Sequence, residues 1–291
     1  MSDYGTCVIL LPEKRFFSGQ QLSDGFIRYA RRFGLETCEP AESRQLQRHF
    51  SCQSGYSWPV AALCRQHDSG DAGTYCWLRA DPIYLQAEIR GARVMACSDF
   101  GLGPDDVMAV VSALQPAFAD YGFTFSAGND GSFYIRCPEN TELPDFLPVM
   151  DLLGCDLAGQ LSASRTWTAL FNECQISLHN HPLNVQRQRD RQLPVNGLWF
   201  WGGGVLPTSV AHSFKSVTST DPVIRALENS SNPKRGRDVL VDLRHVRSWP
   251  EVESHFNPLR STLFDFADGT RWCWRPSWRL RFWRRKSIPV F

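Results

Sequence analysis

Residues 217–243 read VTSTDPVIRALENSSNPKRGRDVLVDL and combine two strand patterns with a helix pattern. Val217–Ser219 is predicted as a strand, and Asp221-Pro222 begins a helix whose first position is proline. Val239–Leu243 has the apolar character of a buried strand. A strand, a helix and a second strand in this order favour parallel strands in one sheet. The stretch therefore indicates an α/β protein.

The surrounding sequence extends this pattern in both directions. Further strands are predicted at Thr6–Leu11, Tyr75–Leu78, Arg93–Cys97 and Gly197–Trp201. Helices are predicted at Gly25–Phe33, Asp105–Ala119 and Ser164–His179. Hairpins are predicted for Phe123–Ser126 with Phe133–Arg136 and for Thr262–Phe266 with Thr270–Trp274. Residues 65–74 and 229–238 are predicted as loops and residues 79–82 as a turn. The predicted fold is α/β, a largely parallel central sheet with helices on its faces plus antiparallel hairpins.

Three parts are predicted along the chain. A connector marked by Pro138 and Pro148 separates an N-terminal α/β part, 1–140, from a second α/β part, 141–260. Residues 261–291 form a C-terminal hairpin and a basic Trp/Arg tail. A single compact domain is the alternative.

Composition describes an ordinary globular chain with an uneven distribution of charge. The 291 residues are 43% hydrophobic and 21% charged, which excludes a mainly disordered, collagen-like or coiled-coil protein. The net charge is +1. All 30 acidic residues and 24 of the 31 basic ones precede Arg271, so residues 1–270 carry −6 and the tail +7. Two oppositely charged regions therefore underlie the near-neutral total.

Cysteine spacing and the N-terminal sequence indicate a cytoplasmic protein. Asp3 comes early, and the apolar run Cys7–Leu11 is shorter than the core of an export signal. No stretch reaches the roughly 18 apolar residues that span a bilayer. The ten cysteines include no Cys-x-x-Cys pair, so neither a zinc site nor a thioredoxin-like site is indicated. Free thiols in a bacterial-type cytosol are expected.

Specific polar residues gather in segment 171–204. His181 and Asn184 are expected in a proline-bent loop, Arg187 follows them, and Asn196 precedes a strand. That strand ends in Gly202-Gly203-Gly204, where backbone N–H groups can approach an anion. We therefore predict a pocket for a small anionic metabolite. The alternative is that these side chains cap the preceding helix and fix the loop. The candidate ligand-binding residues are His181, Asn184, Arg187, Asn196, Gly202, Gly203 and Gly204.

The string from His181 to Arg187, then Pro194-Val195-Asn196 and residues 198–204 (LWFWGGG), resembles archaeal-type cofactor-independent phosphoglycerate mutases. This resemblance covers residues 171–229. Nearly the whole chain resembles the RpfE-type regulatory proteins of proteobacteria, which share residues 77–82, 172–175 and 282–285 with it. One departure is visible: a glycine usual between Arg187 and Pro194 is missing.

The mutase resemblance implies an alkaline-phosphatase-like fold and, in active members, two divalent metals held by Asp and His residues, with a Ser or Thr nucleophile. The first ligand is usually an Asp at the end of the first strand, and residues 8–12 contain none. Beyond Gly204 the imidazoles are His212, His245 and His255, and the nearest remnant of an Asp–His pair is Asp242 with Arg244-His245. The expectation is a pseudoenzyme with no catalytic residues, no metal ligands and no cofactor.

The resemblance thus implies a non-catalytic regulatory or ligand-binding protein for a small phosphorylated or carboxylated metabolite. In this reading, the planar guanidinium of Arg187 binds the anion and His181, Asn184 and Asn196 orient it. The alternative is an active metal-dependent phosphoglycerate mutase or phosphatase, which would require a divalent metal. The two readings differ in whether the chain binds metal and turns over substrate.

The C-terminal tail interleaves seven basic residues with Trp272, Trp274, Trp278 and Trp283. Trp272 and Trp274 are expected to pack on the domain while Arg271 and Arg275 face outward. An acidic protein or a nucleic acid is the partner class for such a surface. The alternative is that the tail arginines offset the acidic body.

Overall fold

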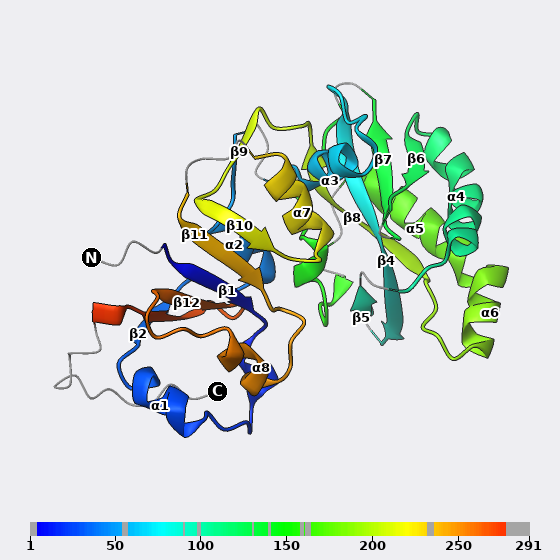
Figure 1. Ribbon diagram of the computed structural model, residues 1–291. Helices are drawn as coiled ribbons and strands as arrows, with labels where there is room; N and C mark the ends of the chain where they lie inside the picture. The colour runs from blue at the N-terminus through cyan, green and yellow to red at the C-terminus, as the bar shows by residue number, and fades with distance from the viewer. Residues whose placement is uncertain are drawn as a thin grey trace. The chain divides into compact units, whose positions relative to one another are not determined.

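The computed structural model describes residues 5–53, 58–89, 91–97, 100–129, 131–138, 141–157, 160, 164–231 and 236–277 (Figure 1). The chain divides into two compact units. Unit 1 comprises residues 1–51 and 210–291, and unit 2 comprises residues 52–209. The chain passes between them within β3 (Ser51–Gln53) and β9 (Ser209–Ala211), which pair with each other.

These unit boundaries differ from the boundaries predicted from the sequence, which divide the chain near residues 140 and 260. The Pro138–Pro148 connector lies inside unit 2. The C-terminal hairpin belongs to unit 1, because its first strand pairs with the first strand of the chain. Segments that follow one another in the sequence therefore belong to different units, and strands from the N-terminal and C-terminal parts of the chain form one sheet.

Unit 1 is an α/β unit around a six-stranded sheet of order β10-β11-β1-β12-β13-β2. The pairs β10·β11, β11·β1 and β1·β12 are parallel, and β12·β13 and β13·β2 are antiparallel. Its elements are β1 (Cys7–Leu11), η1 (Lys14–Phe17), α1 (Asp24–Ala30), β2 (Gly34–Thr37), α2 (Glu42–Gln47), β10 (Phe214–Thr218), α7 (Pro222–Asn229), β11 (Asp238–Asp242), α8 (Trp249–Ser254), β12 (Thr262–Phe266) and β13 (Thr270–Trp274).

One face of this sheet carries an aromatic core. Alternate residues of β1 and β12 point to it, because strand side chains alternate between faces. Helices α1 and α8 cover it through Phe26 and Trp249, whose rings meet edge-to-face at 5.4 Å. Trp272 and Trp274 are buried in the same core, as the sequence predicts. Burial of these large rings gives unit 1 a substantial hydrophobic contribution to its stability.

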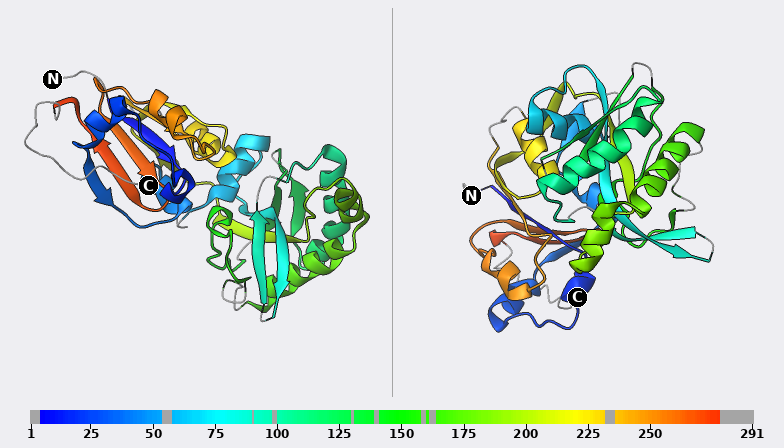
Figure 2. Two further views of the ribbon diagram at one scale, coloured as in Figure 1. Left: turned by 90° about the horizontal axis from the view of Figure 1, so that it is seen from below. Right: turned by 90° about the vertical axis from the view of Figure 1, so that its right-hand side faces the viewer.

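Unit 2 is built on an antiparallel sheet. Its strands follow the order β5-β4-β7-β6, and β8 pairs with β4. Helix α3 contacts β4 and β8, whereas α4 and α5 pack on each other and on β6 and β8 (Figure 2). The elements are α3 (Val60–Ser69), β4 (Cys76–Glu88), β5 (Gly91–Cys97), α4 (Pro104–Ala119), β6 (Thr124–Ala127), β7 (Phe133–Cys137), η2 (Val149–Asp151), α5 (Arg165–His179), α6 (Pro182–Arg189) and β8 (Gly197–Gly204).

The predicted fold class is confirmed: the protein is α/β, with a mostly parallel central sheet, helices and antiparallel hairpins. Three local predictions are wrong. Residues 79–82 continue β4, in which Pro82 opposes Leu198 of β8. Residues 65–69 belong to α3, which ends at Gly70 with φ of 71°. Residues 182–189 form a helix whose first residue is Pro182. In each case polar residues or proline indicate a loop, but pairing and capping override them.

Candidate functional site

A row of charged residues crosses the carboxyl end of the unit 1 sheet. Asp242 of β11 and Asp265 of β12 both lie in register with Leu10 of β1. Asp265 opposes Arg271 of β13, which in turn opposes Glu36 of β2. Registered neighbours share a face of a sheet, so these side chains line up across it. Ligands of open α/β sheets bind at the carboxyl ends of parallel strands, which makes this row the candidate site.

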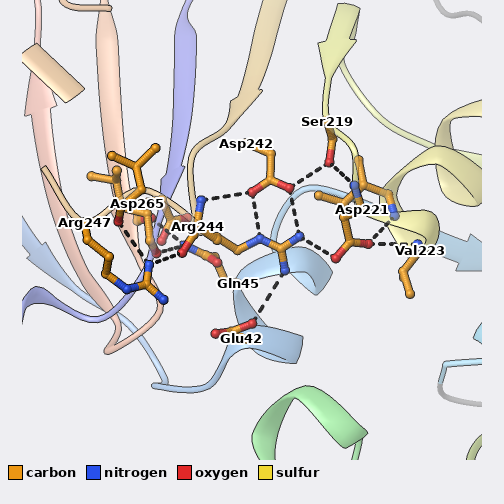
Figure 3. A network of polar contacts seen from close by, with 12 residues as sticks. Glu42, Gln45, Ser219, Asp221, Val223, Asp242, Arg244, Arg247 and Asp265 are labelled. Atoms are coloured by element: carbon orange, nitrogen blue, oxygen red, sulfur yellow. Dashed lines mark hydrogen bonds and ion pairs between the residues drawn. The ribbon is translucent and has the colours of Figure 1, made fainter. Parts of the chain in front are cut away.

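The first part of the site is built around one guanidinium, shown in Figure 3. Arg244 Nε donates to Asp242 Oδ1 at 2.8 Å, and its Nη2 donates to Asp242 Oδ2 at 3.0 Å and Asp221 Oδ2 at 2.9 Å. Arg244 Nη1 lies 3.7 Å from Glu42 Oε2. Ser219 Oγ donates to Asp242 at 2.7 Å. We call these five residues (Glu42, Ser219, Asp221, Asp242 and Arg244) the Arg244 group.

Local sequence explains how the Arg244 group is positioned. Asp221 is the N-cap of α7: its Oδ1 accepts from the N–H groups of Val223 and Ile224 at 2.8 and 3.0 Å. Its second oxygen is therefore left to face Arg244. Asp242 is the last residue of β11, so Arg244 folds back onto it two residues later. The strand end and the helix start together fix two carboxylates around one cation.

Hydrogen bonds and opposite charges keep Asp242 and Arg244 ionised against the effect of burial. Burial raises the pKa of Asp242, but the hydrogen bonds and charge of Arg244 outweigh it and hold that pKa below its usual range. Burial also disfavours the Arg244 cation, whereas Asp242, Asp221 and Glu42 raise its pKa. Three carboxylates face one guanidinium, a formal charge of −2. With only 9% of its side chain exposed, Arg244 is committed to these internal acceptors.

The second part of the site surrounds Asp265, whose side chain is fully buried. Arg48 donates to it twice, from Nη2 at 2.6 Å and Nε at 3.2 Å, and His49 Nε2 lies 2.8 Å away. Arg271 Nε lies at 3.9 Å. Burial raises the pKa of Asp265, but His49 and Arg48 lower it below its usual range. Cations thus outnumber the carboxylate here, opposite to the Arg244 group.

Helix α2 connects the two parts of the site. Glu42 in its first turn faces Arg244, and Arg48 at its C-cap binds Asp265. Between them, buried Gln45 donates through Nε2 to the main-chain oxygens of Leu11 and Asp265. These oxygens belong to β1 and β12, so one amide ties two neighbouring strands to the helix.

The residues predicted from segment 171–204 lie in unit 2 and have internal hydrogen-bond partners. His181 is the N-cap of α6, and its Nδ1 accepts from Leu183 N at 3.2 Å. Asn184 is buried and binds both main-chain groups of Val195, at 2.7 and 2.8 Å, and the oxygen of Leu178 at 2.7 Å. The amide therefore fastens the end of α5 and the segment before β8 to α6.

Arg187 and Asn196 are bound in a similar way. The Arg187 side chain, 3% exposed, donates to the oxygens of Leu193 at 2.8 Å and Phe100 at 2.6 Å, and reaches Asp106 Oδ2 at 3.4 Å. Asn196 exchanges two hydrogen bonds with the backbone of Leu85, at 2.7 and 2.8 Å, as a β-ladder residue would. The guanidinium holds a loop and a helix, and the amide extends the β4·β8 pairing.

The three glycines belong to β8 and permit close packing. Gly202 has φ of 66°, and a Cβ there would lie 3.3 Å from Val60 of α3. A Cβ at Gly203 would lie 2.8 Å from Leu143 and 2.9 Å from Leu78. Gly204 also has positive φ, 148°, and pairs with Trp77. The glycines let a helix and two leucines approach the strand.

Of the basic tail, residues 278–291 lie outside the described residues. Arg271 is partly buried and pairs with Glu36 at 3.2 Å, whereas Arg275 is exposed. Within the described part of the chain, no group of three or more His, Cys, Asp or Glu residues is arranged to hold a metal ion. Among the same residues, no helix has the length and apolar character needed to cross a membrane.

Several site residues escape sequence reasoning. Asp265 carries the clearest signal, because it is an acidic residue inside the apolar strand TLFDF. Arg48 and His49 carry none, since they follow α2 and meet Asp265 only through tertiary folding across more than 200 residues. Asp242 and Arg244 are visible as a pair in the sequence, but their acidic neighbours Glu42 and Asp221 are not.

Comparison with known proteins gives distant structural similarity only. No family model and no curated protein matches the chain. Among solved structures, a cofactor-independent phosphoglycerate mutase from Thermoplasma acidophilum matches with TM-score 0.37 and 13% identity, over 92% of this chain and 89% of that one. The PH0037 protein of Pyrococcus horikoshii matches with TM-score 0.43 and 9% identity, over 93% and 87%. The RpfE-type resemblance stays a prediction.

Proposed function

We propose that this chain is a non-catalytic regulatory or ligand-binding protein with a phosphoglycerate mutase-like sequence segment. The observation that carries the proposal is the position of Arg244, whose guanidinium lies among Asp221, Asp242 and Glu42 at the carboxyl end of the sheet. Carboxylates in such a position are the ligands that divalent cations prefer. Here a permanent side-chain cation lies among them and neutralises one of their three negative charges.

The geometry supports this reading over the enzyme alternative for a further reason. A phosphoryl-transfer site needs cationic groups that can turn toward the substrate's developing negative charge. The donors of Arg244 point to internal carboxylates, and those of Arg48 to Asp265 and the Glu39 main chain. The arrangement therefore favours a role for these guanidinium groups in stabilising the strand ends over a role in phosphoryl transfer.

The proposed ligand class is the small phosphorylated or carboxylated metabolite that the sequence resemblance implies. Because the polar groups of Asn184, Arg187 and Asn196 are bound within unit 2, we assign these residues to maintaining the fold. This corresponds to the alternative role expected for the segment, in which its polar side chains fix the helix and loop.

Two measurements on the full chain test the proposal. Mn²⁺ titrated by calorimetry into wild-type protein, and into the Arg225→Ala variant whose altered residue is exposed on α7, should release no heat beyond that of dilution into buffer. Added 3-phosphoglycerate with Mn²⁺ should give no 2-phosphoglycerate and no free phosphate above a buffer blank. Turnover that disappears in Asp242→Asn and persists in Arg225→Ala would show an active enzyme and overturn the proposal.

A further inference from the structure

Two cysteines lie directly opposite each other in the sheet of unit 2. Cys76 is the first residue of β4 and Cys137 is the last of β7, and the register of this antiparallel pair makes them partners. Opposed residues in antiparallel strands point to one face and have Cα atoms about 4.5–5.5 Å apart. A disulfide spans Cα separations of about 4.4–6.8 Å. The backbone therefore needs no rearrangement to accommodate a bond here.

The two thiols are also in contact and differ in exposure. Cys137 is buried, and a hydrogen bond with Cys76, together with burial, raises its pKa. Cys76 is half-buried, so a small oxidant can reach it first. No disulfide joins any of the ten cysteines, all of which are described. Among the described strand pairs, Cys76 and Cys137 are the one register pair that consists of two cysteines.

We propose that Cys76 and Cys137 are a redox modification site, at which a peroxide converts the two thiols into a reversible cross-strand disulfide. The inference concerns unit 2 and is independent of the function proposed above, which rests on unit 1. It requires only the juxtaposition of the two sulfur atoms and a hydroperoxide as the oxidant.

The chemistry balances in two steps. The Cys76 thiol gives up its proton and its sulfur attacks one peroxide oxygen, forming an S–O bond and breaking the O–O bond; the other oxygen takes up that proton and leaves as water, or as an alcohol from an organic peroxide. The Cys137 sulfur then attacks the Cys76 sulfenic acid, forming the S–S bond, and its proton leaves with the departing hydroxyl as water. Two thiols are oxidised and one peroxide is reduced. A dithiol reductant restores both thiols.

The disulfide would join the first residue of β4 to the last residue of β7, two neighbouring strands of the unit 2 sheet. β4 also pairs with β5 and β8, so its position determines that of the whole sheet. Tyr75, just before Cys76, lies under the guanidinium of Arg136 at 4.9 Å, which already aligns the two strand ends. A crosslink that closes a long loop restricts the unfolded chain, so the oxidised form should melt at a higher temperature.

The test uses the reduced full-length protein treated with one equivalent of hydrogen peroxide, then alkylated with N-ethylmaleimide. The expected product loses two alkylation sites and the mass of two hydrogen atoms. A non-reducing tryptic digest should contain residues 66–79 linked to residues 137–165, and dithiothreitol should release them. The melting temperature should rise on oxidation and return on reduction.

Cys155 lies in the same tryptic peptide as Cys137 and provides the matched control. The link should persist in Cys155→Ser and vanish in Cys76→Ser and in Cys137→Ser. Linked peptides that persist in Cys137→Ser, or wild-type protein oxidised at Cys76 to sulfinic acid without any link, would overturn the proposal. Should a variant fail to fold, the digest of the wild-type protein by itself distinguishes a linked product from an unlinked one.

Discussion

The guanidinium of Arg244 binds the carboxylate of Asp242 through two bonds, Nε to Oδ1 at 2.8 Å and Nη2 to Oδ2 at 3.0 Å. This bidentate contact lies at the carboxyl end of β11, in the central parallel part of the unit 1 sheet. The carboxyl ends of parallel strands commonly bind a ligand, and here a side chain of the protein itself occupies that position. Substitution of Arg244 should therefore reveal how much the guanidinium contributes to stability.

Arg244→Ala should lower the free energy of unfolding of unit 1 by about 3–5 kcal/mol, because it leaves Asp242 and Asp221 buried or half-buried without their cation. Urea unfolding followed by circular dichroism measures the change. Arg225→Ala removes an exposed arginine from the same unit and should shift stability by no more than about 0.5 kcal/mol.

A second readout separates loss of charge from loss of packing. Divalent cations should stabilise Arg244→Ala against heat and leave wild-type protein unchanged, since the carboxylates of the variant regain a positive partner. Equal melting temperatures for Arg244→Ala and Arg225→Ala would contradict a structural role for the guanidinium.

Asp265 should make unit 1 sensitive to acid. Its pKa in the folded protein is lowered, so its ion pairs stabilise the fold fully above the unfolded pKa of about 3.9 and are lost as pH falls through the lower folded pKa. Asp265→Asn should therefore be less stable than wild type near pH 7, by about 3–5 kcal/mol, and the gap should narrow below about pH 4. Urea unfolding across pH measures both.

The matched control is Asp24→Asn, which changes an exposed aspartate in the first turn of α1. Its stability should follow that of wild type closely at every pH. A constant gap between wild type and Asp265→Asn from pH 7 to pH 2 would mean that Asp265 contributes through packing or neutral hydrogen bonds instead of charge.

Most helices and strands of this fold can be predicted from the sequence, because capping residues, turn residues and apolar runs lie within or next to the element that they define. The capping Asp221 with Pro222, the apolar strand Val239–Leu243 and the hairpin at Ala267-Asp268-Gly269 are all where the sequence places them. The unit boundaries are less accessible, because they depend on β1 pairing with β11 and β12 across more than 200 residues. Nothing local to Thr6–Leu11 indicates those partners.

The candidate site shows the same limit. Sequence reasoning singles out Arg187 as an anion partner because its chemistry fits, but its acceptors Phe100 and Asp106 are more than 80 residues away. Whether a polar side chain meets a ligand or a distant backbone oxygen is decided by tertiary contacts. Buried Asp265, in contrast, has a visible signal in its apolar strand.

Arg187→Ala should destabilise unit 2 by about 2–3 kcal/mol, since it leaves the oxygens of Leu193 and Phe100 without their donor. The loss should be the same with and without 3-phosphoglycerate, because this guanidinium is assigned to the fold. Differential scanning fluorimetry at several metabolite concentrations measures this loss.

The matched control is Arg189→Ala, an exposed position on the same helix, which should change stability little. A metabolite-induced shift in wild type and Arg189→Ala that is absent in Arg187→Ala would instead place the ligand at Arg187.

Gly269 should tolerate no side chain, because it lies in the β12·β13 turn beside the Asp265 strand. Its φ is 82°, and a Cβ would lie 2.2 Å from the main-chain oxygen of Cys38. Gly19 has nearly the same φ, 80°, with nothing within 4 Å of its Cβ position. Gly19→Ala should therefore cost about 1 kcal/mol for backbone strain alone. Gly269→Ala should cost at least about 2 kcal/mol more, because the backbone at Cys38 must shift. Equal losses in urea unfolding would mean that the Cys38 segment moves aside freely and that its hydrogen bond to Gly269, at 2.7 Å, contributes little to the turn.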